Sequence, residues 1–180
     1  MPFEFQKLEI DDVILIKPKI FADNRGFFLE CYKRSDFERA GIKDIFIQDN
    51  HSISFKSVIR GLHFQKKPYE QSKLVKCTYG KIFDVAVDLR RDSKTYKKWV
   101  GVELSDENSF MLYIPKGFAH GFCVLSDKAE VIYKCDCEYM KDYDSGIRWD
   151  DPDINIKWPC LNPILSDKDK NLPYLKDVII

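Results

Sequence analysis

The sequence has no excess of charge of either sign, because 29 lysines and arginines balance 29 aspartates and glutamates. Proteins that hold nucleic acid or a membrane surface by general electrostatics carry a basic excess, so the balance argues against that class of function. Long apolar runs are also missing, and no segment approaches the roughly 20 residues of a membrane helix. The N-terminal stretch MPFEFQKLEIDDVILIKPKI has acidic residues before its short apolar run and no small-residue cleavage site. We therefore expect a cytoplasmic protein.

Cys-x-x-Cys pairs are absent, although the chain contains 6 cysteines. They are scattered through apolar segments without the density of a small secreted scaffold, so we expect reduced and mostly buried thiols. Cys135 and Cys137 would share one face of a strand, but a zinc site there would need histidines at ligand spacing, which the segment lacks. The sequence therefore predicts no metal site.

Helical periodicity is scarce. Only the segment 35–41, SDFERAG, combines a serine cap, helix formers and a closing glycine, and it predicts one short helix near the N-terminus. The other regular segments are short, apolar, aromatic or β-branched, and turn formers such as DNRG and PKG separate them. They predict strands over 13–18, 26–32, 45–54, 58–64, 74–79, 82–88, 99–104, 109–114, 120–125 and 129–137. Many short strands with regular turns indicate an all-β sandwich or barrel.

The C-terminal part from Met140 has a different composition, with many aspartates and with prolines at 152, 159, 163 and 173. Proline removes a ladder hydrogen bond and breaks long strands. We expect this irregular, partly helical segment to wrap the barrel, so that a single domain covers residues 1–180.

Polar residues interrupt one strand that should be apolar, VIRGLHFQ at 58–65. Side chains alternate faces along a strand, so Arg60 and His63 can share one side only if the chain twists or bulges at Gly61. Taken alone, a buried arginine is equally consistent with a structural ion pair. Further polar clusters lie beside strand-like sequence, namely DNRGFF, QDNHS, EQSKL, IPKGFAHGF and LSDKD. Together they favour a binding cavity inside a small barrel.

The spacing from Gly61 through His63 to Gly80, followed by PKGFAH at 115–120, resembles the two motifs of the cupin superfamily, which implies a jelly-roll β-barrel. Cupins usually hold a metal with a His-x-His pair, a glutamate and a later histidine. Here Gln65 stands where the second histidine of the pair would be. A complete set of three histidine ligands therefore cannot form from His63 and His120.

Residues 10–172 are similar in collinear order to the dTDP-4-dehydrorhamnose 3,5-epimerase family, the metal-independent branch of the cupins. The segments that carry the similarity are FADNRGFFLE, FIQDN, VIRGLHFQ, QSKLV, KIFDVAVDLR, IPKGFAHGF, VIYKC and ILSDKD. The resemblance implies inversion of carbons 3 and 5 of dTDP-4-dehydro-6-deoxy-D-glucose through an enolate. The product, dTDP-4-dehydro-L-rhamnose, feeds dTDP-L-rhamnose and polysaccharide biosynthesis. The resemblance to the family further implies that the enzyme needs no cofactor and that it forms a homodimer with exchanged N-terminal strands.

The resemblance also assigns roles in catalysis. His63 matches the base, and Asp169 the carboxylate that orients it, with Asp167 as the alternative. Lys73 lies at the position that stabilises the enolate, and Tyr133 at that of the acid on the opposite face of the sugar. For either aromatic residue taken alone, Tyr133 or Tyr139, an ordinary core position is the competing interpretation.

The remaining matched positions bind the nucleotide sugar. They are Arg25, Glu30, Gln48, Asp49, Asn50, Arg60, His120 and Lys168, together with Tyr139, which would stack on the thymine, and Asp144, where the family often has glutamate. Within the family, a mono-epimerase or an epimerase of another 4-keto nucleotide sugar stays open. Outside it, the alternatives are an iron-dependent cupin dioxygenase and a non-catalytic module that binds nucleotide sugars.

Overall fold

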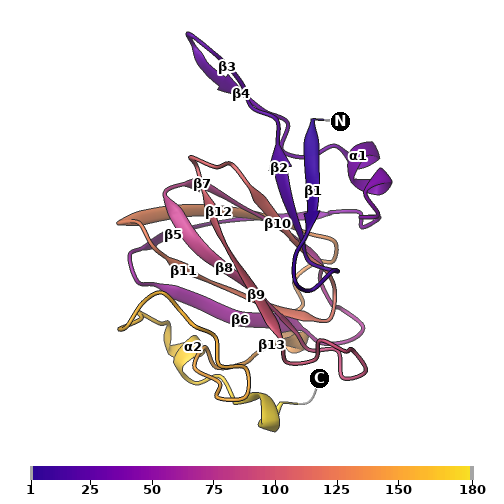
Figure 1. The fold of residues 1–180 in the computed structure, drawn as a ribbon. Helices are drawn as coiled ribbons and strands as arrows, with labels where there is room; N and C mark the ends of the chain where they lie inside the picture. The colour runs from indigo at the N-terminus through magenta and orange to yellow at the C-terminus, as the bar shows by residue number, and fades with distance from the viewer. Residues whose placement is uncertain (1, 179–180) are drawn as a thin grey trace.

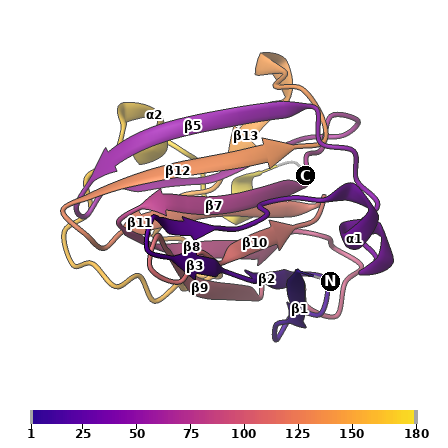
Figure 2. The ribbon, with the colours of Figure 1, turned by 90° about the horizontal axis from the view of Figure 1, so that it is seen from above.

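Two antiparallel sheets form the body of the molecule, which a computed structural model describes from residue 2 to residue 178 (Figure 1). Residues 1, 179 and 180 of the expected domain lie outside the described residues. The 6-stranded sheet has the order β1 (Phe3–Lys7), β2 (Ile14–Pro18), β10 (Met111–Ile114), β7 (Lys73–Tyr79), β12 (Lys128–Cys135), β5 (Gln48–Phe55). The 5-stranded sheet has the order β13 (Asp144–Gly146), β6 (Ile59–Gln65), β11 (Phe118–Val124), β8 (Lys81–Asp88), β9 (Trp99–Ser105). Seen from above, β5, β12 and β7 lie side by side in one layer (Figure 2).

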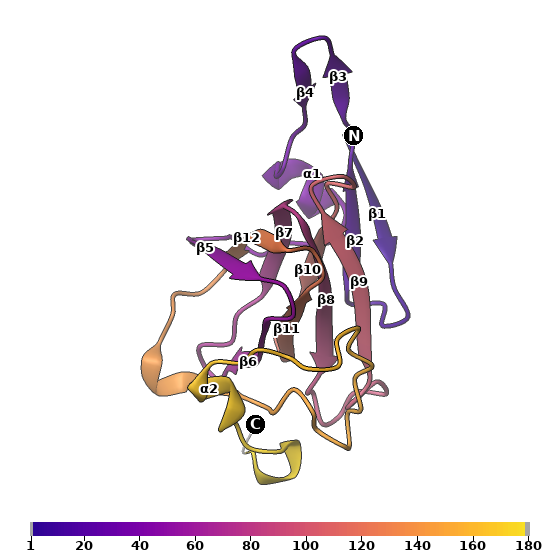
Figure 3. The same cartoon turned by 90° about the vertical axis from the view of Figure 1, so that its left-hand side faces the viewer.

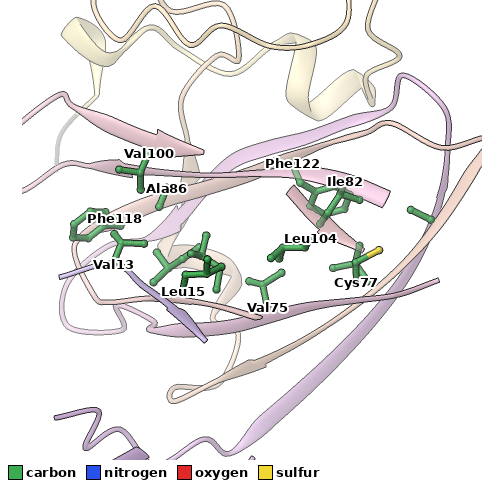
Figure 4. Close-up of a cluster of buried hydrophobic side chains, with 14 of the residues drawn as sticks. Val13, Leu15, Val75, Cys77, Ile82, Ala86, Val100, Leu104, Phe118 and Phe122 are labelled. Atoms are coloured by element: carbon green, nitrogen blue, oxygen red, sulfur yellow. The ribbon is translucent and has the colours of Figure 1, made fainter. Parts of the chain in front are cut away.

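The core between the sheets follows from alternation along the strands. In β8, Ile82 and Ala86 point inward, whereas Phe83 and Val85 point to the outer face. Side chains from both sheets meet inside the barrel, and Figure 4 shows Leu15 and Val75 of one sheet near Leu104, Ile82 and Phe122 of the other. Burying one such side chain contributes about 1.5–3 kcal/mol to folding. This core fills one part of the barrel and leaves the polar cavity described below.

The C-terminal segment covers the outer face of the five-stranded sheet, as expected (Figures 1 and 3). Ile154, Ile156 and Leu175 pack against Val85 and Val87 of β8. The segment contains η1 (Lys141–Tyr143), α2 (Asp167–Lys170) and η2 (Leu175–Asp177). It is pinned to the barrel where the backbone N–H of Ile59 donates to the Ile164 carbonyl at 3.0 Å. This docking fixes the position of α2 relative to β6.

The N-terminal region departs most from the expected element bounds. β1 is not among the strands expected from the sequence. It is an edge strand whose exposed residues, Glu4, Gln6 and Lys7, are polar or charged, and it lacks the β-branched residues typical of a strand. The strand expected over 26–32 ends at Phe28 and forms a hairpin of β3 (Phe21–Asp23) and β4 (Gly26–Phe28), which projects beyond the barrel (Figure 3). The expected helix is present as α1 (Arg34–Arg39), but its N-cap is Lys33 rather than Ser35. Among the described helices, none is long and apolar enough to cross a bilayer.

Candidate active site

A cavity with a volume of about 290 Å³ lies between the two sheets. Its polar lining is supplied by strands of both sheets: Asn50, His51 and Ser52 of β5, Arg60 and His63 of β6, Lys73 of β7, His120 of β11 and Tyr133 of β12, with Phe122 as the apolar wall. Residues far apart in the sequence thus surround one space. A concave site with convergent titratable groups is the usual form of a small-molecule site.

A bulge allows Arg60 and His63 to face this cavity together. His120 pairs with His63 and Phe122 pairs with Arg60, so two residues of β6 stand opposite the single residue Gly121. Gly61 has a φ of +118°, and a Cβ on it would lie 2.6 Å from the Cα of Gly121. Only glycine fits such a close approach with a positive φ. The expected irregularity at Gly61 is confirmed.

Arg60 is held by neutral acceptors. Its Nε donates to the Ser54 hydroxyl at 2.8 Å and its Nη2 to the Ile53 carbonyl at 3.3 Å. Within residues 2–178 it has no carboxylate partner. The competing interpretation of Arg60 as one half of a structural ion pair is therefore wrong, and its guanidinium charge is available to an anion.

His63 lies 2.6 Å from Asp169, measured from Nε2 to Oδ1. α2 supplies the carboxylate, and its N-cap Ser166 accepts a hydrogen bond from the Asp169 N–H. Burial would raise the pKa of Asp169, but the hydrogen bond and charge of His63 outweigh burial and lower it. Because an ionised carboxylate only accepts, Nε2 carries the hydrogen and Nδ1 has the free lone pair. The alternative assignment of Asp167 as the carboxylate that orients His63 is wrong, since the Asp167 side chain is 96% exposed and pairs with Lys170.

Lys73 lies in the wall of the cavity, 9% exposed. Burial lowers the pKa of its ammonium. Its Nζ lies 5.9 Å from the centroid of the Tyr133 ring, and in the described part of the chain it has no hydrogen-bonded or ion-paired partner. Burial raises the pKa of Tyr133, so its phenol is protonated at neutral pH. Both groups therefore present donors to the cavity.

Sequence reasoning missed Asp84. Its Oδ1 accepts from Nε2 of His120 at 2.7 Å, and both side chains are buried. Alternation in KIFDVAVD places Asp84 on the inner face between Ile82 and Ala86, which was the available signal. Alternation does not predict that His120 is the partner of Asp84, because that contact depends on the register between β8 and β11.

A second network adjoins the cavity through Asn50, one of the lining residues. Tyr139 donates from its hydroxyl to Asp144 at 3.1 Å, and Lys168 forms an ion pair with the same carboxylate. Gln48 accepts from the Tyr139 N–H at 2.7 Å and donates to Asn50 at 3.0 Å. The structure therefore brings these expected binding residues together.

The other expected binding residues do not line this cavity. Arg25 lies at the tip of the β3–β4 hairpin, exposed and paired with Asp23 at 2.6 Å. Asp49 pairs with Lys134 at 2.9 Å. Glu30 follows β4 and has one buried carboxylate oxygen without a partner in residues 2–178.

Gln65 performs a structural task at the position where cupins have their second histidine. Its amide donates to the carbonyls of Tyr69 at 2.7 Å and Glu138 at 3.1 Å, and it accepts from the Met140 N–H at 2.6 Å. The side chain is therefore fully engaged in joining loops at one end of the barrel. In the part of the chain that is described, no group of three or more histidine, cysteine, aspartate or glutamate side chains could hold a metal ion.

Residues 7–177 match the family model described as dTDP-4-dehydrorhamnose 3,5-epimerase. The chain belongs to this family. An enzyme of that name from Shigella flexneri is 58% identical over 166 residues, 92% of each chain. Similar solved structures include the Bacillus anthracis enzyme with TDP and PPi bound (TM-score 0.94, 48% identity, 96% of this chain and 99% of that one). They also include the Legionella pneumophila enzyme in complex with dTDP-4-keto-L-rhamnose (TM-score 0.95, 44% identity, 98% of this chain and 95% of that one).

Membership confirms the fold and the class of reaction expected from the sequence. The chain is an isomerase, an epimerase of dTDP-rhamnose biosynthesis, built on a cupin-like jelly roll. An iron-dependent dioxygenase and a non-catalytic module are therefore wrong interpretations.

Proposed function

We propose that the cavity between the sheets inverts carbons 3 and 5 of dTDP-4-dehydro-6-deoxy-D-glucose by proton removal and return, with His63, Asp169, Lys73 and Tyr133 as the catalytic residues. The observation that carries the proposal is that His63 and Tyr133 come from facing sheets, β6 and β12, and line one cavity with Lys73. Inversion requires removal of the proton on one face and its return on the other. A base and an acid on opposite walls meet that requirement.

His63 removes the proton through Nδ1. Asp169 holds the hydrogen on Nε2 and stabilises the imidazolium that forms when Nδ1 takes the proton. A hydrogen next to a ketone is acidified by the carbonyl, so the developing negative charge moves to the keto oxygen. The Lys73 ammonium stabilises that charge, and one preorganised donor of this kind contributes about 3 kcal/mol.

Tyr133 returns the proton from the opposite wall. Its raised pKa keeps the phenol protonated, and its hydroxyl has no hydrogen-bonded partner among the described residues. A phenol whose hydroxyl is not engaged in a hydrogen bond can donate its proton to the enolate carbon. Retention is avoided because the imidazolium of His63 lies on the other side of the ring.

The nucleotide part of the substrate is held at the mouth of the cavity and by arginine. Arg60 has no carboxylate partner in residues 2–178 and suits bidentate contact with a pyrophosphate oxygen pair. Tyr139 stacks on the thymine, and Gln48, Asp49, Asn50, His120, Asp144 and Lys168 complete the binding set. The similar structures from Bacillus anthracis, with TDP and PPi bound, and from Legionella pneumophila, in complex with dTDP-4-keto-L-rhamnose, support a dTDP sugar as the ligand.

Arg25 and Glu30 bind the nucleotide of a partner subunit in a cytoplasmic homodimer. The projecting hairpin exposes Phe21, Phe27 and Phe28, which are 48%, 64% and 66% accessible. Apolar side chains exposed together mark a surface that another chain covers. Exchange of the N-terminal strands would bury them and bring Arg25 to the partner's cavity.

Proton NMR in heavy water tests the reaction. The protein is incubated with dTDP-4-dehydro-6-deoxy-D-glucose, and deuterium entry is followed at carbons 3 and 5. We expect entry at both, and formation of dTDP-rhamnose when a downstream reductase is added. Entry at one carbon would mean a mono-epimerase, and entry at neither would direct attention to another 4-keto nucleotide sugar.

The Tyr133→Phe variant separates the two halves of the reaction. Proton removal by His63 is retained, so deuterium still exchanges, whereas inversion falls by about 100-fold, the usual contribution of one general acid. Equal loss of exchange and inversion would contradict Tyr133 as the acid.

A further inference from the structure

Asp84 is a buried carboxylate in the middle of a core strand. Its side chain is fully buried, Oδ1 accepts from Nε2 of His120, and Oδ2 has no partner within residues 2–178. An ionised carboxylate removed from water costs several kcal/mol unless a nearby positive charge offsets that cost. One neutral imidazole and one unsatisfied oxygen do not supply such an offset.

Among the described residues, Lys73 is a buried cation that lacks an anionic partner, just as Asp84 is a buried anion that lacks a cationic one. It is a buried ammonium without an ion-paired partner in the described chain, and it extends from β7 of the facing sheet into the same cavity. The titratable and charged groups around Lys73 and His120 are Cys135 and Tyr133 of β12, Asp84 of β8, His63 and Arg60 of β6, His51 of β5, Asp144 of β13 and Lys168 of α2.

Elimination leaves one unmatched negative charge in that set. Asp144 is already paired with Lys168 and accepts from Tyr139. Burial raises the pKa of Cys135 to about 11, so its thiol is neutral. Asp84 is the carboxylate of this set that forms no ion pair with a lysine or arginine of the described residues.

We propose that Asp84 is a positioning residue of this epimerase site: its carboxylate fixes the hydrogen of His120 on Nε2, and its charge keeps the Lys73 ammonium charged inside the barrel. The inference rests on the proposed function, because Lys73 must be an ammonium to stabilise the enolate. Asp84 itself does not touch the reacting atoms.

The tautomer of His120 determines which part of the sugar it can bind. Burial lowers the pKa of His120, and the charge of Asp84 offsets only part of that effect, so the imidazole is neutral. With the hydrogen of Nε2 donated to Asp84, Nδ1 presents a lone pair to the cavity. A lone pair accepts from a sugar hydroxyl and does not bind the keto oxygen. The keto oxygen is therefore left to Lys73.

The charge of Lys73 sets the alkaline limit of activity. Burial lowers the pKa of Lys73, the charges of Asp84 and Asp144 oppose this effect, and the charge of Lys168 adds to it. Removing the Asp84 charge lowers this pKa further, so Lys73 loses its proton at a lower pH. Only the alkaline limit is expected to depend on Asp84.

The test is the pH profile of kcat/KM for the full-length Asp84→Asn variant. We expect its alkaline limb to move to lower pH by about one unit or more, the usual effect of one nearby charge in a buried site. The acidic limb stays in place, and kcat/KM at any pH on the alkaline limb falls by about tenfold. The matched control is Asp88→Asn, on the same strand and also fully buried but bonded to Arg90, Ser93 and Thr95, which leaves both limbs unmoved. An alkaline limb of Asp84→Asn at the wild-type pH would overturn the proposal.

Two measurements need no turnover and separate this inference from the proposed function. Nitrogen-15 NMR of labelled histidine should place the His120 hydrogen on Nε2 in the wild type and show loss of that tautomer in Asp84→Asn; the same tautomer in both proteins contradicts the proposal. Where Asp84→Asn is poorly folded, Lys73→Met/Asp84→Asn removes both charges and should melt at a higher temperature than Asp84→Asn. A lower or equal melting temperature counts against the charge pair. Wild-type protein that fails to exchange deuterium would instead refute the proposed function.

Discussion

The two histidine–aspartate pairs of the cavity differ in how the chain supplies the carboxylate. His120 meets Asp84 across neighbouring strands of one sheet, 36 residues apart in sequence. His63 meets Asp169 from α2, 106 residues along the chain. The first pair is sealed, with the His120 side chain 7% exposed, whereas His63 is 31% exposed to the cavity.

Under the proposed function, this difference separates a binding residue, His120, from a catalytic one, His63. The sealed pair forms as soon as β8 and β11 pair, so it belongs to the barrel itself. The open pair forms only when the C-terminal segment docks on β6, and docking thus orients His63, the proposed base. A base must reach its substrate and stay exposed on one side, and a distant segment can orient it without covering that side.

Removing the base is expected to have the largest effect. His63→Ala should lower deuterium exchange at carbons 3 and 5 by about 10⁴-fold, the upper range for a general base. The affinity for dTDP, measured by calorimetry, should change little, because the proposed mechanism places His63 against the sugar rather than the nucleotide. His63→Asn, which fills more of the space, should be as inactive. Exchange at the wild-type rate in His63→Ala would refute the assignment.

Replacing the carboxylate of the His63–Asp169 pair is expected to have the second largest effect on activity. In Asp169→Asn the amide nitrogen donates to Nε2, so the imidazole hydrogen moves to Nδ1 and blocks the base. We expect kcat to fall by about 10²–10³-fold, since the wrong tautomer alone disables a histidine base. Asp167→Asn is the matched control, on the same short helix and 96% exposed on its side chain. Its kcat should stay within about twofold of the wild type, and equal losses in the two variants would remove Asp169 from the mechanism.

The sequence was sufficient for the part of the fold that alternation controls. Inner residues such as Ile82 and Ala86 follow directly from period-two patterning, and so does the inward position of Asp84. The pair His63 and Asp169 was accessible only through the resemblance, because no local rule joins residues 106 apart. The choice of Asp169 over Asp167 was decided by the orientation of α2.

Other features could not be predicted because they depend on the register of strand pairing or on which short segments pair at all. His120 pairs with Ala86 across the ladder, which places Asp84 diagonally within reach of the imidazole. A one-residue shift would turn the carboxylate to the other face. Arg25 is an example of the second kind. It lies on a projecting hairpin whose two strands are short and exposed, and such segments carry no sequence pattern that predicts their pairing.

A third buried aspartate sharpens the comparison, and its removal should affect stability rather than activity. Burial alone would raise the pKa of Asp88, but hydrogen bonds from Arg90, Ser93 and Thr95 outweigh it and lower the pKa to about 2. A carboxyl with a depressed pKa stabilises the fold above its unfolded value, and that contribution is lost as pH falls toward 2. Asp88→Asn should therefore lower the free energy of unfolding by about 2 kcal/mol at pH 7.

Urea unfolding followed by circular dichroism, at one protein concentration, measures the Asp88→Asn difference at pH 7 and again below pH 3. The difference should shrink across that range because the wild-type carboxyl becomes protonated. Asp127→Asn is the control, since this aspartate is 98% exposed and pairs with Lys56 at 3.5 Å. An exposed ion pair contributes about 0–1 kcal/mol, so the control should change little at either pH. A pH-independent loss in Asp88→Asn would mean that packing, rather than the charge, explains this aspartate, and that buried carboxylates in this barrel are not all held by their charge.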